Sequence, residues 1–408
     1  MSIRPEVVTD TAPGHAVKGL PVRVLFVHYG ENWIRGTETV LLELVRRLDR
    51  TRFQPYVACN HESLAEAVRT AGVEAFVIDR PTIWVDGLRT RIEPIRWLRT
   101  VRALRDLAGR LGVDLLCCMN GQPSMVAYYA GNRGRIPCVS YVHSFYIRRD
   151  IHLYRIPRVP AVLFCSDEVR ASIVRKARLR GAIHVIHNGV DLTRFRPSDD
   201  AEARSHARER AGIPLDRVVV GQVGSLIHRK GVDLLIRAAA DLLGAGAPVH
   251  VAFVGSGPDA DGFRRLAAEL GIADQVTFAG DLRDPAPWYR DIFDINVLAS
   301  RAEAFGVALI EGAASGLPLV AARTGGMQEI VREGVTGLFF EPGDARDLAA
   351  KLGRLVGDVG LRERLGRAAL ADARERFSIE GQVRGIERVF DETILSASGG
   401  GARPARAP

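Results

Sequence analysis

Two glutamates eight residues apart, Glu303 and Glu311, flank the part of this chain that could most plainly do chemistry. An apolar run over residues 294–300 precedes them, and the pattern that follows predicts a helix ending at residues 316–318. A strand, a glycine turn and a helix N-terminus in this order present main-chain N–H groups that attract anions. We expect Glu303 just before this N-terminus and Glu311 about two turns inside the helix.

Such an arrangement can hold a phosphorylated ligand that is rich in hydroxyl groups. The amides would bind the phosphate, and the two carboxylates would accept hydrogen bonds from the hydroxyls. The alternative is that Glu303 only caps the helix and that Glu311 is solvated.

Two adjacent cations, Arg229 and Lys230, favour the interpretation as a ligand-binding site over the capping alternative. They follow a predicted strand that ends in Gly221-Gln222-Val223-Gly224-Ser225. Arginine can bind a diphosphate bidentately and lysine acts as a point charge, although this loop could also be merely solvated. Gly255, in another glycine turn after a predicted strand, is a weaker candidate.

The first half of the chain has candidates at its own strand ends. Gly36 and Thr37 follow the first predicted strand and begin a helix, where glycine would let the backbone approach a ligand closely. His143 ends a later strand, although a lone histidine is more often structural than catalytic. Residues 187–191, His-Asn-Gly-Val-Asp, predict a tight turn that shapes a domain junction.

The composition is that of an ordinary soluble protein of 408 residues, 47% of them apolar and 25% charged. We find no run long enough to span a bilayer, and no signal-peptide pattern in residues 1–20. The five cysteines show no metal-ligand or Cys-x-x-Cys spacing, which favours reduced thiols in the cytoplasm. We expect no metal site, because no Asp-x-Asp motif stands at a strand end.

The net charge of +8 comes from the first half of the chain. Residues 1–198 contain 30 Lys and Arg against 18 Asp and Glu, whereas the remainder contains 26 against 30. This imbalance indicates an anionic surface or substrate on that side. Nucleic acid ranks low, because no helix-turn-helix, zinc-finger or aromatic RNA-binding pattern accompanies the charge.

Short apolar strands alternate with helical patterns, which predicts an α/β protein with two domains, each a doubly wound parallel sheet. We place the first domain at residues 21–197 and the second at 198–377. A helix over 378–395 is expected to cross back to the first domain. Residues 1–20 and 396–408 are predicted to be disordered. The predicted strands cover residues 22–27, 54–59, 74–78, 115–119, 138–142 and 162–165, then 218–224, 249–254, 276–278, 295–298 and 319–321. Ligands of such sheets bind in a cleft at the carboxyl ends of the strands.

Together these segments resemble glycosyltransferase family 4, a group of retaining, nucleotide-sugar-dependent enzymes of the GT-B fold. The resemblance covers about residues 22–395. Four motifs in the family's order carry it: Arg229-Lys230-Gly231, Glu303 with Glu311, residues 185–197, and Thr324-Gly325-Gly326 with Glu329.

The resemblance implies a role for each candidate. Glu311 would hold the ribose hydroxyls and Glu303 those of the donor sugar. Arg229 and Lys230 would neutralise the leaving diphosphate, and His143 would lie near the transferred sugar. The other donor-binding positions that it implies are Gly36, Thr37, Gly224, Ser225, Gly255, Ala304, Phe305, Gly306 and Val307, with main-chain amides around 305–307 meeting the sugar and diphosphate.

Two positions depart from the family pattern. Many members carry arginine directly after the glycine that corresponds to Gly224, whereas this chain has Ser225. We infer that Arg229 takes over that charge. The family's paired glycines in the first loop are Arg35-Gly36 here, which could alter contacts with the acceptor or phosphate.

The resemblance implies metal-independent transfer of a hexose with retention, and no cofactor beyond a nucleotide-diphosphate sugar as co-substrate, with a UDP-sugar as our first choice. No carboxylate is clearly placed as a covalent nucleophile, so we favour front-face attack by an acceptor hydroxyl. The expected product is a cell-surface polysaccharide, glycolipid or glycoside. A nucleotide-sugar epimerase of the same fold and a non-catalytic nucleotide-sugar binding protein are the alternatives.

Residues 91–111 predict a basic amphipathic helix. Arginines recur every three residues beside an apolar stripe; the arginines are Arg96, Arg99, Arg102 and Arg105, and the stripe is Trp97, Val101, Leu104 and Leu111. Such a helix could dock a cytoplasmic protein on the anionic inner face of the membrane, next to a lipid-linked acceptor. Alternatively, the stripe packs on the first sheet and the arginines are solvated. Trp84 and Tyr146, as exposed aromatics, could line an acceptor site.

Overall fold

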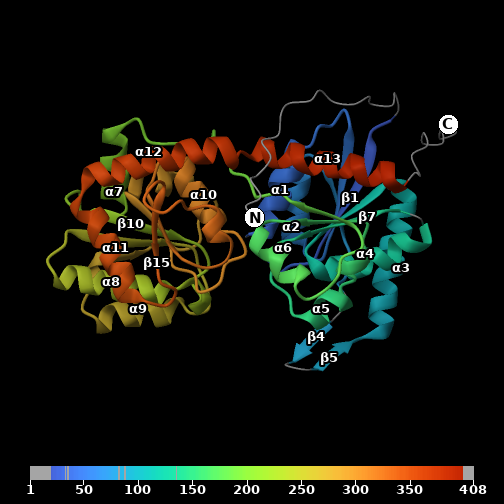
Figure 1. The fold of residues 1–408 in the computed structure, drawn as a ribbon, viewed down its shortest axis with the longest axis horizontal. Helices are drawn as coiled ribbons and strands as arrows, with labels where there is room; N and C mark the ends of the chain where they lie inside the picture. Colours follow the sequence, from blue (N-terminus) through green and yellow to red (C-terminus); the bar gives the residue numbers. More distant parts are fainter. Residues whose placement is uncertain are drawn as a thin grey trace, which may run out of the picture.

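The computed structural model describes residues 20–32, 34, 36–80, 83–86, 89–134 and 136–397. Its ribbon shows two βα domains side by side, joined along one edge by the last helix (Figure 1). The predictions for residues 1–19, for Arg35, for the side chain of Trp84 and for residues 398–408 lie outside the described part of the chain.

The first domain is built on a seven-stranded parallel sheet in the order β3-β2-β1-β6-β7-β8-β9. Every residue of β6, β7 and β8 is buried, as expected where both faces of a parallel sheet are covered. The strands are β1 Val22–His28, β2 Phe53–Cys59, β3 Glu74–Val77, β6 Leu115–Met119, β7 Cys138–Val142, β8 Ala161–Phe164 and β9 Ala182–Val185. The helices are α1 Thr37–Arg47, α2 Glu62–Thr70, α3 Pro94–Leu111, α4 Gly121–Gly134, α5 Arg148–Leu153, α6 Asp167–Val174 and the turn η1 Ile156–Arg158.

The second domain repeats this plan with six parallel strands in the order β12-β11-β10-β13-β14-β15. The strands are β10 Val218–Val223, β11 Val249–Val254, β12 Val276–Phe278, β13 Ile295–Leu298, β14 Leu319–Ala322 and β15 Gly337–Phe340. The helices are α7 Ala201–Arg210, α8 Val232–Gly244, α9 Ala260–Glu269, α10 Val307–Ala314, α11 Ala345–Gly357, α12 Val359–Arg376 and α13 Ile379–Ala397. Short turns are η2 His228–Lys230, η3 Ala273–Gln275, η4 Trp288–Ile292 and η5 Gly325–Glu329.

The predicted fold class is confirmed, and each predicted strand begins and ends within one residue of an observed one. Four strands were missed. β9 is short and exposed, with no apolar run to mark it, and β15 lies in a glycine-rich stretch. The hairpin of β4 Ile83–Asp86 and β5 Arg89–Ile92 is a separate antiparallel pair in an arginine-rich segment.

The last helix links the two domains. Figure 1 shows α13 continuing the line of α12 and lying along the first domain. Its Phe390 packs against Phe26 and Phe53, with ring centroids 6.1 and 5.8 Å apart. The side chain of Gln382 accepts a hydrogen bond from the main chain of Gly189 at 2.8 Å. α13 ends at Ala397, two residues beyond the predicted end.

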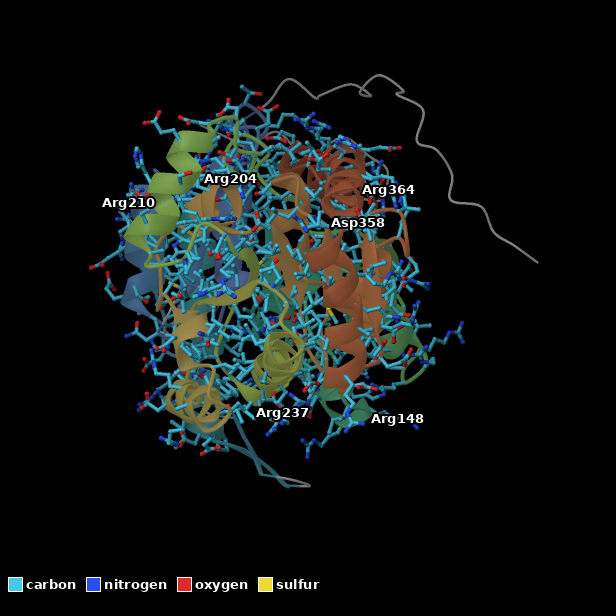
Figure 2. All side chains as sticks on the ribbon, turned by 90° about the vertical axis from the view of Figure 1, so that its left-hand side faces the viewer. Arg148, Arg204, Arg210, Arg237, Asp358 and Arg364 are labelled. Carbon is cyan, nitrogen blue, oxygen red and sulfur yellow. The ribbon has the colours of Figure 1, made fainter. Side chains whose placement is uncertain are left out.

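Polar side chains at helix starts organise the outer face of the second domain, which Figure 2 shows from that side. Asp200 ends the predicted linker by capping α7, where it accepts from the N–H of Ala203 at 2.9 Å. Arg204 on α7 donates to the carboxylate of Asp294 at 2.8 Å, which ties the helix to the residue before β13. Asp358 caps α12 in the same way as Asp200 caps α7.

Candidate active site

The loop between β13 and α10 carries the first predicted glutamate and the predicted amides. α10 begins at Val307, and Gly306 precedes it with a φ of +113°, which glycine adopts without strain. The helix therefore starts later than predicted, and Glu311 lies about one turn inside it rather than two. Among the described residues, the N–H groups of Phe305, Gly306 and Val307 donate no hydrogen bond, so these helix-terminal donors are available to a ligand.

Glu303 forms an ion pair instead of capping the helix. Its Oε2 lies 2.5 Å from Nζ of Lys230 and accepts from Oγ of Ser300 at 3.1 Å. Only 14% and 16% of the Glu303 and Lys230 side chains are exposed, so solvent screens the pair weakly. Cε of Lys230 lies 3.9 Å from where a Cβ on Gly224 would stand. The capping alternative is wrong, and Gly224, Lys230 and Glu303 form one cluster.

Arg229 belongs to the same loop but is exposed. Its Nη1 donates to the carbonyl of Ala302 at 2.8 Å. Nearby, Arg301 donates to the carbonyl of His228 at 2.7 Å and to both carboxylate oxygens of Asp233. Burial acts to raise the pKa of Asp233, but the hydrogen bonds and charge of Arg301, together with smaller contributions from His228 and the main chain, outweigh burial and lower this pKa. These contacts hold the loop of residues 228–230 against residues 301–302, which lead to Glu303. Arg301 and Asp233 were not predicted from the sequence.

The two glycine turns of the second domain meet at the carboxyl edge of its sheet. A Cβ on Gly255 would stand 2.1 Å from the carbonyl oxygen of Gly224, so only glycine allows the turns after β10 and β11 to touch. Ser225 follows Gly224 in the first of these turns and is half-buried. The structure thus brings these three predicted residues close to Lys230.

Glu311 is half-buried and hydrogen-bonded to a tyrosine of the same domain. Oη of Tyr289 donates to its carboxylate at 2.9 Å. Burial raises the pKa of Glu311 to about 7, although this hydrogen bond and the charge of Arg194 act in the opposite direction. The solvated alternative is therefore wrong. A carboxyl group with a pKa near neutrality can accept hydrogen bonds from a diol when it ionises.

In the first domain, the side chain of Asn120 bonds two of the predicted residues, His143 and Thr37. Its Oδ1 accepts from the main-chain N–H of His143 at 2.9 Å, and its Nδ2 donates to Oγ1 of Thr37 at 3.4 Å. Gly36 precedes Thr37 at the start of α1, with a φ of +45°. Asn120 itself has a φ of +85°, which is unusual for a residue with a side chain. It was missed, although an Asn-Gly pair directly after a buried strand was the signal that could have revealed it.

His143 is neutral at physiological pH. Its ring lies 4.0 Å from that of Tyr141, and its buried Nε2 has no hydrogen-bond partner among the described residues. Burial, helped by the nearby His28, lowers the pKa of His143 to about 3. His28 in turn forms a buried pair with Glu38, 2.8 Å between Nε2 and Oε1, which sequence reasoning also missed.

Tyr146 is not the exposed aromatic that was predicted. The residue is half-buried, and its Oη accepts from the N–H of Gly121 at 3.0 Å while lying 3.3 Å from Oδ1 of Asn120. Tyr146 therefore belongs to the same hydrogen-bonded group as Asn120.

The two groups of candidates come from different domains. In the part of the chain that the structure describes, no hydrogen bond or ion pair joins Gly36, Thr37 or His143 to Lys230 or Glu303. The loop of Glu303 does reach the first domain, because Oγ of Ser166 donates to the carbonyl of Ala304 at 2.6 Å. Residues 20–397, outside the gaps given above, contain no group of three or more His, Cys, Asp and Glu side chains arranged for a metal ion.

The stripe predicted on α3 packs inward. Val101 and Leu104 are buried, and the half-buried Trp97 lies edge-on to Tyr129 with 5.0 Å between ring centroids. The exposed apolar residues of α3 are instead Ile95 and Leu98, exposed by 68% and 47%. No helix within the described ranges is both long and apolar enough to cross a bilayer.

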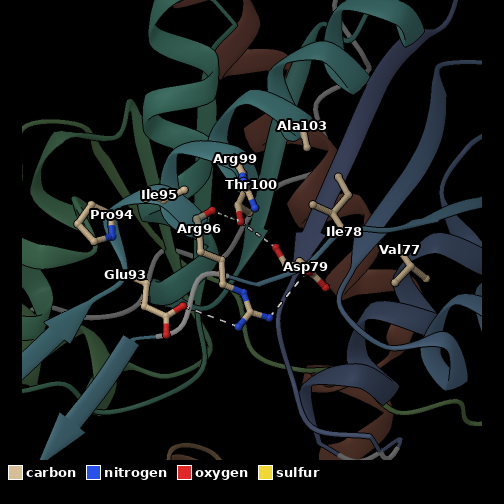
Figure 3. Close-up of a pocket in the computed structure, with 10 residues that line it drawn as sticks. All are labelled: Val77, Ile78, Asp79, Glu93, Pro94, Ile95, Arg96, Arg99, Thr100 and Ala103. Atoms are coloured by element: carbon tan, nitrogen blue, oxygen red, sulfur yellow. Dashed lines mark hydrogen bonds and ion pairs between the residues drawn. The ribbon is translucent and has the colours of Figure 1, made fainter.

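A cavity of about 770 Å³ opens at the start of α3, beside the end of the edge strand β3. Figure 3 shows Arg96 in this cavity between two carboxylates, 3.8 Å from Asp79 and 3.9 Å from Glu93. None of the predicted catalytic or donor-binding residues lines it.

Two family models match the chain. The model described as Glycosyltransferase Family 4 covers residues 34–194, and that described as Glycosyl transferases group 1 covers residues 203–372. The D-inositol 3-phosphate glycosyltransferase 1 of Catenulispora acidiphila is 34% identical over 307 residues, which are 68% of this chain and 71% of that protein. The D-inositol 3-phosphate glycosyltransferase of Acidothermus cellulolyticus is 38% identical over 224 residues, 52% of this chain and 48% of that protein.

Solved structures share the fold across nearly the whole chain. Anabaena HepE in complex with UDP and glucose gives a TM-score of 0.79 at 21% identity, over 90% of this chain and 99% of that one. The sucrose-phosphate synthase of Thermosynechococcus elongatus gives 0.76 at 19% identity, over 92% and 100%. The fold is therefore GT-B, the architecture of one class of glycosyltransferases. The chain belongs to glycosyltransferase family 4.

Proposed function

We propose that this glycosyltransferase moves a hexose from a nucleoside diphosphate donor to a hydroxyl of an acceptor, with retention of the anomeric configuration. The observation that carries the proposal is the partly buried ion pair of Lys230 and Glu303 beside the main-chain N–H groups of residues 305–307, which donate no hydrogen bond among the described residues. The cation and the amides suit a diphosphate, and the carboxylate suits sugar hydroxyls.

The chemical step needs charge stabilisation at the leaving group. When the bond from the anomeric carbon to the diphosphate breaks, negative charge develops on the diphosphate, which Lys230 and the helix-terminal amides would stabilise. The acceptor oxygen forms the new bond on the same face, and its proton passes to the departing diphosphate. Glu303 is engaged by Lys230, so we do not assign it as a covalent nucleophile. Because the protein supplies this positive charge, we expect turnover to persist in a metal chelator.

For the donor we propose a UDP-hexose, the ligand class in the HepE complex with UDP-glucose. For the acceptor we propose an anionic polyhydroxyl compound, in line with the excess of cations in residues 1–198. A phosphorylated cyclitol is one candidate, since relatives are named for D-inositol 3-phosphate. A lipid-linked precursor of a cell-surface polysaccharide, glycolipid or glycoside is the other.

A ligand panel tests the donor. UDP-, GDP- and ADP-sugars are compared by thermal shift, because a ligand that binds only the folded protein raises its melting temperature. The best donor is then incubated with each acceptor class, and NMR gives the anomeric configuration of the product. We expect a UDP-hexose to bind best, and we expect the product to keep the anomeric configuration of the donor. An inverted product would contradict the mechanism, and release of an epimerised nucleotide sugar without acceptor would support the epimerase instead.

We also propose that residues 91–111 contact an anionic membrane surface on the cytoplasmic side. Ile95, Leu98, Arg99 and Arg102 are all exposed, and their spacing of three and four residues places them on one face of α3. Aliphatic side chains beside cations are what the interface of an anionic bilayer binds.

Vesicle flotation tests this contact. The variant Ile95→Gln with Leu98→Gln should float less with anionic vesicles than the unchanged protein. Val359→Gln, which removes an aliphatic residue 60% exposed in the second domain, serves as the control. Equal flotation with neutral and anionic vesicles would contradict the proposed surface.

A further inference from the structure

The first turn of α6, in the first domain, is bonded by residues of the second domain. Glu329, at the end of η5, accepts hydrogen bonds from the main-chain N–H groups of Asp167 and Glu168, both at 2.9 Å. Ser166 is the N-cap of α6, and its Oγ donates to the carbonyl of Ala304 at 2.6 Å. The N–H groups that a helix leaves unsatisfied at its start are thus bonded by a carboxylate of the other domain.

Glu329 is tightly coupled to residues 299–306, the loop between β13 and α10, which we call the donor loop. A Cβ on Gly325 would stand 2.0 Å from the carbonyl oxygen of Glu303, and one on Gly326 would stand 2.3 Å from that of Ala304. The N–H of Gly326 donates to the carbonyl of Glu303 at 3.1 Å. Because η5 and the loop touch through their backbones, they form one unit of the second domain, and the bonds of Glu329 and Ala304 to α6 hold this whole unit against the first domain.

His187 adds a third link from the segment that connects the domains. Its Nε2 lies 2.8 Å from Oε2 of Glu329. Its ring stacks on Phe305, with 5.3 Å between centroids and 19° between planes. Phe305 is itself buried against Phe377. The side chain of Phe305 is therefore occupied by packing, which leaves only its main chain for a ligand.

We propose that Glu329, assisted by Ser166 and His187, is a positioning residue that fixes the donor loop against the first domain. The sugar held at Glu303 then faces the acceptor bound near His143. In this arrangement Glu329 acts on the relative position of the two substrates and leaves the donor contacts within the second domain unchanged. The kinetic part of this inference rests on the proposed function, whereas the geometric part does not.

Single-molecule fluorescence transfer tests the geometric part. Cysteines introduced at two exposed sites, Asp106→Cys on α3 and Arg237→Cys on α8 (Figure 2), carry the dyes. The native cysteines do not compete, because all five are buried. Glu329→Gln should broaden the distribution of distances between the domains. The same distribution in Glu329→Gln and in the unchanged protein would overturn the proposal.

Glu333→Gln is the matched control. Glu333 also accepts from a main-chain N–H, that of Phe339 at 3.0 Å, and pairs with Arg323 at 2.9 Å, but all three residues belong to the second domain. Its loss should lower the melting temperature without changing the interdomain distances. If Glu333→Gln broadened the distribution as much as Glu329→Gln, the effect would be general loosening and the proposal would fail.

Kinetics test the positioning role itself. Glu329→Gln should lower kcat about tenfold, since small misplacements of reacting groups are costly, while the donor Kd stays within about twofold of its original value. Ser166→Ala should act in the same direction, and the two effects should not add, because both residues serve one contact. An unchanged kcat, or a donor Kd that rises as much as kcat falls, would overturn the role. If the distances shift but the unchanged enzyme transfers no sugar, the proposed function is wrong and the contact stands.

Discussion

The two domains build their halves of the candidate site from different chemistry. The second domain uses charge: Lys230 and Glu303 form a partly buried ion pair, and Arg301 with Asp233 fixes the loop beside it. The first domain uses neutral groups: the amide of Asn120 gathers its neighbours, and His143 has its pKa lowered to about 3 by burial. A charged half suits a diphosphate, and a neutral half suits hydroxyl groups. Under the proposed function, this difference places the leaving diphosphate at the second domain.

Lys230→Ala is expected to have the largest effect. It removes the cation next to Glu303 and leaves that carboxylate without its ion-pair partner. Loss of one preorganised charge-stabilising group typically costs about 3 kcal/mol of barrier, so kcat should fall roughly a hundredfold. Steady-state kinetics with saturating donor measure it.

Two neighbouring variants sharpen this prediction. Arg229→Ala should cost less, about tenfold, because its guanidinium is exposed and already bonded to a carbonyl. Arg237→Ala removes an exposed cation on α8 and should leave kcat unchanged. Near-normal transfer by Lys230→Ala would remove the diphosphate role of this residue.

Glu311 should make donor binding depend on pH. In the proposed donor site, ribose hydroxyls would donate to the ionised carboxylate of Glu311, whose pKa is raised by burial to about 7. The donor Kd should therefore rise as pH falls below 7, by up to about tenfold per unit, and Glu311→Gln should abolish the dependence. Titration calorimetry between about pH 6 and 8 measures it. A flat profile in the unchanged protein would contradict this assignment.

The same group should affect stability with the opposite sign. Between its ordinary pKa of 4.5 and about 7, the folded protein keeps a proton that the unfolded chain has released. Its stability relative to Glu311→Gln should therefore fall as pH rises through this window and level off above it. Urea unfolding of both proteins across that range checks the sign.

Substitution of Asn120 should have the smallest of these effects on activity, and we expect it in kcat/KM for the acceptor. Asn120→Ala removes the hydrogen bond to His143 and the longer one to Thr37 at 3.4 Å. A loss of about 1 kcal/mol for the two together should lower kcat/KM for the acceptor roughly fivefold. Asn120→Asp keeps the acceptor oxygen and should retain most activity. Asn120→Gly relieves the positive φ but keeps no side chain, so it separates strain from bonding. A change in the donor Kd in any of these three variants would contradict the assignment of the donor to the second domain and of the acceptor to the first.

The fold was predictable because several of its strands are continuous apolar runs, such as Leu115–Met119 and Leu319–Ala322, which the sequence pattern reveals directly. In the charged half of the site, Arg229 and Lys230 could be proposed because they are neighbours in sequence, whereas the ion pair of Arg301 and Asp233 was not predicted. The hairpin β4–β5 was not, because it has no such run.

The neutral half and the domain contact depend on long-range geometry. Asn120 meets His143 only when β6 and β7 pair, and Glu329 reaches α6 across a separation of about 160 residues. On α3, spacing identified an apolar stripe but did not show which side faced the sheet, so Ile95 and Leu98 were overlooked. Such contacts leave no local pattern, and tertiary structure decides them.

A crystal structure with a bound UDP-sugar tests the central claim most directly. The account predicts diphosphate oxygens within about 3 Å of Nζ of Lys230 and of the main-chain nitrogens of residues 305–307, with the sugar at Glu303. A diphosphate bound elsewhere, with Lys230 and these amides untouched, would contradict it.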